Sequence, residues 1–181
     1  MLLLALSLLQ PANAGNQGYY RFPAVHDDTV VFTAEGDLWR VGIDGGAAQR
    51  LTSHHGQETH AHISRDGTTI AFSAQYDGPT EVYVMPIDGG RPRRLTWQGD
   101  RAHVVGWTPD GGVLYSTRHF STLPDTQLAV APLDGTTPEP LPLAQAIDGA
   151  FVGDGIVFTR FKQGSKTKRY EGGTAQSLWR W

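Results

Sequence analysis

Residues 60–96 read HAHISRDGTTIAFSAQYDGPTEVYVMPIDGGRPRRLT. The Arg-Asp-Gly at 65–67 predicts a tight turn, because glycine tolerates the positive φ that many hairpins require. The apolar run after this turn, and the runs at 82–85 and 93–96, have the composition of short strands. A second turn, Asp-Gly-Gly at 88–90, separates the last two runs. The stretch therefore predicts one antiparallel sheet of four short strands.

The same pattern recurs along the chain with a period of roughly 44 residues. An apolar residue stands three positions before an acidic turn residue in four copies, at Val25, Ile63, Trp107 and Phe151. The second strands of these copies are predicted at 30–32, 70–72, 113–115 and 156–158. Their apolar character suits strands that are covered on both faces. Four short strands in a unit of this length are typical of a β-propeller blade.

We therefore predict an all-β protein, a β-propeller built from four-stranded antiparallel blades. The partial propeller is predicted over residues 15–181, with blades at about 19–52, 58–96, 103–143 and 148–181. The fourth copy stops after its third strand, so about three and a half blades of a ring are present. We expect the chain to be the truncated N-terminal portion of a longer protein.

The copies differ at their turns and outer strands. Glycine follows the turn aspartate at Gly67, Gly111 and Gly155, which predicts positive φ at these residues. The first copy has Asp28 and Thr29 there instead, so we expect a different turn. Outer strands are predicted at 49–52, 93–96 and 140–143. Their charges and prolines discourage edge-to-edge pairing with other chains.

Charge and the N-terminus restrict partners and location. The formal net charge is -3 and the two signs are interspersed, which favours neither nucleic acid nor a membrane as partner. The chain begins with an apolar run that is too short to span a bilayer, and alanine stands at positions 12 and 14. We predict a signal peptide over residues 1–14 and a periplasmic or secreted protein. A cytoplasmic location is the alternative, because no Lys or Arg precedes Arg21.

Several motifs resemble those of one superfamily. They are the turn at 65–67 with the strand after it, VYV at 82–84, DGG at 88–90 and RLT at 94–96. This combination resembles the repeat of TolB-like propellers and of propeller-bearing peptidases. Segments 104–111, 138–143 and 168–176, the last followed by Leu178 and Trp179, are more specific. They are similar to the first propeller of bacterial tricorn-type serine proteases, and this resemblance covers residues 19–181.

The resemblance implies a function for the longer protein. Tricorn-type proteases carry a six-bladed propeller, then a seven-bladed one, then a PDZ-like module within a serine-protease core. The catalytic residues belong to that core, so this chain is expected to supply no catalytic residue, to use no cofactor and to be inactive alone. Its expected role is to form a scaffold and a passage for peptide substrates and products in an exported peptidase, with a homo-oligomer as one arrangement of the full-length protein. The alternative is a TolB-like periplasmic propeller that binds a protein partner.

One basic stretch, at 162–169, interrupts the last copy between its second and third strands. One interpretation is a solvated insertion loop. The other is a set of contacts for peptides in the passage, made by Lys166, Lys168, Arg169 and Tyr170. Cationic side chains with an aromatic neighbour attract and hold the carboxylate at a peptide end.

Histidines and serines supply the remaining candidates. His60 and His62 alternate on a predicted strand and would project from one face, as a metal pair would, while His54 and His55 precede them. Zinc needs three or four ligands, and Glu58 is the only nearby carboxylate, so the alternative is an inter-blade loop and an inner strand near the channel. Ser64, Ser73 and Ser116 lack a Gly-x-Ser-x-Gly motif, and we predict no catalytic nucleophile.

Overall fold

The computed structural model describes residues 18–161 and 176–181, which form strands and turns. Within these residues there is no helix long and apolar enough to cross a membrane. The first sheet contains β1 (Arg21–His26), β2 (Thr29–Ala34), β3 (Asp37–Gly42) and β4 (Gly45–Arg50). The second contains β5 (Glu58–Ile63), β6 (Thr69–Ala74), β7 (Glu81–Pro86) and β8 (Arg93–Arg94). The third contains β9 (His103–Trp107), β10 (Val113–Thr117), β11 (Gln127–Ala131) and β12 (Glu139–Pro140), and the fourth β13 (Asp148–Val152), β14 (Gly155–Thr159) and β15 (Leu178–Arg180).

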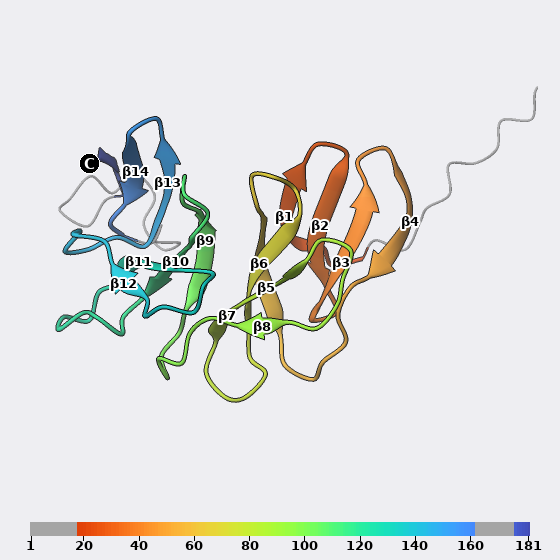
Figure 1. Cartoon of the computed structure of the whole chain (residues 1–181), viewed down its shortest axis with the longest axis horizontal. Coiled ribbons are helices and arrows are strands. Elements are labelled where there is room, and N and C mark those ends of the chain that lie inside the picture. Colours follow the sequence, from red (N-terminus) through yellow and green to blue (C-terminus); the bar gives the residue numbers. More distant parts are fainter. Residues whose placement is uncertain (1–17, 162–175) are drawn as a thin grey trace, which may run out of the picture.

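The strands of every sheet are antiparallel and follow chain order. The first strands of successive sheets lie next to one another, β1 beside β5, β5 beside β9 and β9 beside β13. In Figure 1, β4 and β12 lie toward opposite sides of the molecule, with β1, β5 and β9 between them. The four sheets thus form three and a half blades of a propeller that is not closed, with the first strands innermost. This confirms the predicted all-β propeller fold.

Apolar side chains between successive sheets form three clusters. Each cluster holds residues of two neighbouring sheets: Val31 with Phe72, Val84 with Tyr115, and Leu128 with Ile156. The second strands supply much of this core, and every residue of β10 is buried. Full burial of one such side chain stabilises the fold by about 1.5–3 kcal/mol. The predicted second strands are therefore correct. In the second and third sheets they are covered on both faces, whereas β14 alternates between buried and half-buried residues.

A repeated main-chain hydrogen bond joins each sheet to the next. The amide of Glu58 donates to the carbonyl oxygen of Gly36 at 2.8 Å, and the amide of Ala102 donates to that of Thr80 at 2.9 Å. The third junction has the same bond, from the amide of Ala146 to the carbonyl oxygen of Thr126, at 2.9 Å. Each sheet is therefore bonded, near the start of its third strand, to residues at or just before the first strand of the following sheet.

The hairpins between the first two strands of each sheet fall into two classes. In the second and third sheets they are five residues long, and the glycines have positive φ as predicted, +72° at Gly67 and +90° at Gly111. In the first sheet two residues connect the strands, and Asp27 has φ of +46°, which confirms a different turn. The prediction for Gly155 is wrong, because Gly155 lies in β14 and Gly153 has the positive φ, +61°.

Two outer strands end before the predicted positions, because β4 ends at Arg50 and β8 ends at Arg94. The leucine after each still pairs with the third strand, because Leu51 and Leu95 donate main-chain hydrogen bonds to Leu38 and Val82, both at 2.8 Å. The predicted positions 51–52 and 95–96 therefore lie beside the sheet without being part of the regular strand.

Candidate functional site

The candidate site is a cavity of about 580 Å³ at the innermost strands. Residues from all four sheets line it, among them Phe22, His60, His62, His103, Asp148 and Thr159. Because the first strands of the sheets face the middle of the propeller, this cavity lies where a central passage would run. A volume of this size is within the range of ligand-binding pockets.

Irregular backbone positions two of the lining side chains. β1 and β5 each contain a register shift in their pairing with the second strand, and in each a bulky residue has positive φ, +52° at Phe22 and +53° at His60. Such conformations cost about 1–3 kcal/mol and are frequent at functional sites. β-bulges also redirect side chains. The two bulges therefore aim equivalent residues of neighbouring sheets into the same cavity.

The aromatic rings in the cavity pack against one another. The rings of Phe22 and His60 have centroids 4.2 Å apart, and those of His60 and His103 are 4.8 Å apart. Nδ1 of His60 lies 2.9 Å from the hydroxyl oxygen of Thr59. Three sheets thus contribute to one continuous row of rings, whose faces offer an apolar surface and whose imidazoles offer hydrogen bonds.

Two imidazoles of the cavity, those of His60 and His62, are uncharged near neutral pH. Burial, and then the neighbouring His103, His62 and Arg21, lower the pKa of His60 to about 4. Burial also lowers the pKa of His62, although the carboxylate of Asp148 acts in the opposite direction. The cavity therefore presents the neutral rings of Phe22, His60 and His62 together with polar side chains, and Asp148 is an exposed carboxylate at its lining.

The predicted pairing of His60 and His62 is correct in one respect, since both side chains line this cavity. The regular alternation expected between them is interrupted by the bulge in β5. His54 lies elsewhere, with its ring 4.3 Å from that of Tyr76. Within residues 18–161 and 176–181, no group of three or more His, Asp or Glu residues is placed to hold a metal ion. The structure thus gives the metal hypothesis no support there.

The serines have structural roles or lie in the core. The hydroxyl of Ser64 donates to Asp66 at 2.6 Å within a hairpin. The hydroxyl of Ser73 accepts a hydrogen bond from the amide of Val104 at 2.8 Å and so joins two sheets. Ser116 is buried in β10 and lines the cavity.

The four predicted passage residues, Lys166, Lys168, Arg169 and Tyr170, lie outside the described residues. The described residues on either side of their segment are informative, because both Thr159 and Gln176 line the cavity. Sequence reasoning missed Phe22, His103 and Asp148. Their common signal is a place on or at the start of the first strand of a blade, but no motif marks the bulges that direct the rings.

Comparison with known proteins identifies the family. Residues 17–181 match the family described as the tricorn protease N-terminal beta propeller domain. The chain is 40% identical over 179 residues to tricorn protease homolog 1 of Streptomyces coelicolor. This match covers 96% of the chain and 16% of that protein. It is 27% identical over 168 residues to the tricorn protease homolog of Saccharolobus solfataricus, covering 90% of this chain and 16% of that protein.

Solved structures agree with the sequence comparisons. A crystal structure of the tricorn protease superposes with a TM-score of 0.78 and 25% identity, over 90% of this chain and 17% of that one. TolB from Acinetobacter baumannii superposes with a TM-score of 0.63 at 17% identity, over 83% and 39% of the two chains, which shows a shared fold alone. The chain thus spans about 16% of the length of each of the two curated relatives named above. It belongs to the family of tricorn protease N-terminal β-propeller domains.

Proposed function

We propose that this chain is a non-catalytic propeller segment of an exported tricorn-like serine peptidase and that it controls the passage of peptides. The observation that carries the proposal is the cavity at the innermost strands, to which all four sheets contribute. The family assignment supports a peptidase as the full-length protein over a TolB-like binding propeller, since the likeness to TolB is limited to the fold.

Peptide contact is supported by the chemistry of the cavity. Neutral imidazoles and aromatic rings contact peptide groups without a large desolvation penalty, and polar lining groups bind the peptide main chain. Among the described residues, the buried hydroxyl of Thr159 has no hydrogen-bond partner. It lines the cavity just before the basic segment, so in this proposal the cations at Lys166, Lys168 and Arg169 attract the carboxylate end of a peptide to the cavity.

The test uses peptide hydrolysis by a full-length peptidase that carries these blades. Replacing Lys166, Lys168, Arg169 and Tyr170 together by Ala should raise KM for peptides with a free carboxylate about five- to tenfold, with kcat unchanged. The effect should shrink with added salt and be absent for C-amidated peptides. The matched control is Arg91→Ala with Arg93→Ala, which removes two exposed cations from the region of the outer strand. An unchanged KM for free-carboxylate peptides in the variant would disprove the carboxylate contact, as would equal KM values for free and amidated peptides in the parent enzyme.

Location is a separate part of the proposal. Residues 1–14 lie outside the described residues, and their role as a signal peptide rests on the sequence. Fractionation of cells that make the protein, with sequencing of the mature N-terminus, should find a periplasmic or secreted form that begins after Ala14. A cytoplasmic form that retains Met1 would contradict export.

A further inference from the structure

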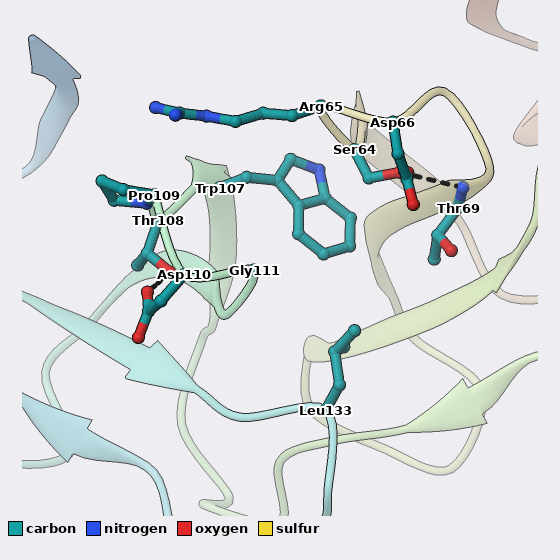
Figure 2. Close-up of a pocket in the computed structure, with 10 residues that line it drawn as sticks. All are labelled: Ser64, Arg65, Asp66, Thr69, Trp107, Thr108, Pro109, Asp110, Gly111 and Leu133. Carbon is teal, nitrogen blue, oxygen red and sulfur yellow. Dashed lines mark hydrogen bonds between the residues drawn. The ribbon is translucent and has the colours of Figure 1, made fainter.

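Two cavities flank the hairpin at residues 108–111, away from the candidate passage. One, of about 300 Å³, lies between this hairpin and the hairpin of the second sheet (Figure 2). The other, of about 330 Å³, lies between the same hairpin and the outer strand of its own sheet, next to the fourth sheet. Thr108, Pro109 and Asp110 line both of them. The two cavities are therefore the two sides of one projecting hairpin.

Each cavity contains one aromatic side chain from the end of a first strand. Figure 2 shows the ring of Trp107 between the two hairpins, with Leu133 below it. The indole nitrogen of Trp107 donates to the carbonyl oxygen of His62 at 3.1 Å, which fixes the ring against the second sheet. Phe151 has the corresponding position in the next sheet and lines the second cavity. Two apolar surfaces are thus held at fixed positions, one on each side of the hairpin.

The hairpin between them is held by hydrogen bonds among its own residues. The amide of Thr108 donates to the carbonyl oxygen of Gly112 at 2.9 Å, and the amide of Gly112 donates to the hydroxyl of Thr108 at 2.8 Å. The same hydroxyl bonds to Asp110. Gly111 supplies the positive φ of the turn. A surface made by such a hairpin is preorganised, which lowers the entropic cost of binding.

The lining of the two cavities carries a net negative charge. Its acidic members are Asp66, Asp110 and Glu139, against a single cation, Arg65. Hydrogen bonds from the Ser64 hydroxyl and from the amide and hydroxyl of Thr68 lower the pKa of Asp66 to about 2. All three of these bonds reach Oδ1, so the other carboxylate oxygen is available to a partner. The charges therefore complement a basic occupant.

The equivalent place between the first and second sheets is built differently. There, Nε2 of His26 lies 2.9 Å from the carbonyl oxygen of Arg65. The imidazole packs so closely on Gly67 that a Cβ atom at Gly67 would lie 2.9 Å from it. The imidazole thus occupies the space between these two hairpins. The space beside the hairpin is therefore filled at this junction and open on both sides of residues 108–111.

We propose that the two cavities beside residues 108–111 form a docking site for an extended, basic segment of a partner protein. One apolar side chain of the segment contacts Trp107 and Leu133, and a second contacts Phe151. A Lys or Arg of the segment pairs with the carboxylates of Asp66, Asp110 or Glu139. Cavities of about 300 and 330 Å³ have room for a large side chain each, and an extended chain that crosses the hairpin reaches both.

The test selects peptides from a random decapeptide library displayed on phage, with the folded protein as the target. Enriched sequences should contain two apolar residues and at least one Lys or Arg. Binding of the synthetic, capped, fluorescein-labelled peptides is then measured by fluorescence anisotropy. Glu139→Lys should weaken binding at least tenfold and Leu133→Ser about three- to fivefold, because both residues are exposed lining residues.

The matched control is Asp27→Asn, which removes a carboxylate from the hairpin of the first sheet and keeps a residue that tolerates positive φ. It should change the dissociation constant less than twofold. Thermal unfolding of each variant establishes that it is folded before binding is compared. The proposal is overturned if no sequence is enriched, if enriched peptides lack basic residues, or if Glu139→Lys and Leu133→Ser bind them like the parent protein.

Discussion

The second and third sheets hold their outer strands in the same register with different side chains. Tyr83 pairs with Arg94 in the second sheet, and Ala129 pairs with Pro140 in the third. The main-chain bond after this pair is also the same, 2.8 Å from the amide of Leu95 to Val82 and 2.8 Å from the amide of Leu141 to Leu128. The backbone of the blade is therefore repeated where the side chains are not.

In the second sheet the outer strand is attached through a buried carboxylate. Glu81 accepts hydrogen bonds from Arg94 and from the amide of Gly99, both at 3.0 Å, and from the hydroxyl of Thr96. In the third sheet Gln127 stands at the corresponding position and donates to the carbonyl oxygen of Leu143 at 3.1 Å. The first sheet resembles the second in pairing Asp37 with Arg50, but the hydroxyl of its Thr52 donates to Glu58 of the second sheet.

This difference teaches that the buried acid and the arginine of the outer strand form one unit. Where the acid is replaced by an amide, the arginine is replaced by Pro140 and no threonine follows. A buried carboxylate is tolerated only where donors compensate its desolvation. Proline can stand in the third sheet because the edge position needs no main-chain donor there. The predictions below test whether the unit is as interdependent as this comparison suggests.

The largest effect is expected from removal of the buried acid. Glu81→Ala should lower the free energy of unfolding by about 3–5 kcal/mol, because Arg94 and the Gly99 amide lose their partner inside the protein. Urea denaturation measures the change. Glu139→Gln, an exposed position in β12, is the control and should be neutral within about 0.5 kcal/mol. If Glu81→Ala with Arg94→Ala is as unstable as Glu81→Ala alone, the half-buried cation of Arg94 is not the cause.

A smaller effect is expected when the acid is introduced into the third sheet. Gln127→Glu should cost about 1–3 kcal/mol, since it loses the donor to Leu143 and adds an uncompensated charge. Adding Pro140→Arg, which restores the arginine at the position of Arg94, should recover part of that loss. Thermal melts of the single and double variants give the coupling energy. Strictly additive effects would show that the two positions do not interact.

The smallest expected effect is a difference between the second and third sheets in how acid changes stability. His60, three residues before Ile63, corresponds to Val104 of the third sheet. In the unfolded chain His60 binds a proton near pH 6.5, but in the folded protein it does so only near pH 4. The free energy of unfolding therefore decreases as the pH falls through this window. The expected loss is about 1–2 kcal/mol, reduced by solvent screening. Glu58, whose pKa is raised by burial, acts in the opposite direction.

Urea denaturation at several pH values between 4 and 7 tests this contribution. His60→Phe should flatten the pH dependence, and phenylalanine already adopts the same positive φ at Phe22. His55→Phe makes the same replacement in an exposed loop and should keep the parent behaviour. An unchanged slope in His60→Phe would assign the acid response to other groups.

The sequence predicted the sheets because their determinants are local. Apolar runs such as 70–72 and glycines such as Gly67 carry their structural meaning within a few residues. The turn at 153–154 was misassigned because Asp154 and Gly155 have the residue types of the longer hairpins, while Gly153 allows the backbone to turn earlier. Local sequence does not decide between two glycines that both tolerate the turn.

The cavity was less predictable than the fold. His60 and His62 were recognised as neighbours on one strand, but the rings of Phe22 and His103 come from other sheets. Their convergence depends on the bulges in β1 and β5 and on how the sheets pack, which are long-range properties. The Trp107 cavity likewise depends on two hairpins that are far apart in sequence.

The bond from Glu58 to Gly36, repeated from Ala102 to Thr80 and from Ala146 to Thr126, has a consequence for biosynthesis. Each carbonyl acceptor leaves the ribosome roughly 20 residues before its donor, a delay of about 1–4 s at 5–20 residues per second. During that interval a newly made blade has one face uncovered. The nascent chain should therefore gain protease resistance in steps, one for each blade, with every step delayed until the following blade has begun to emerge.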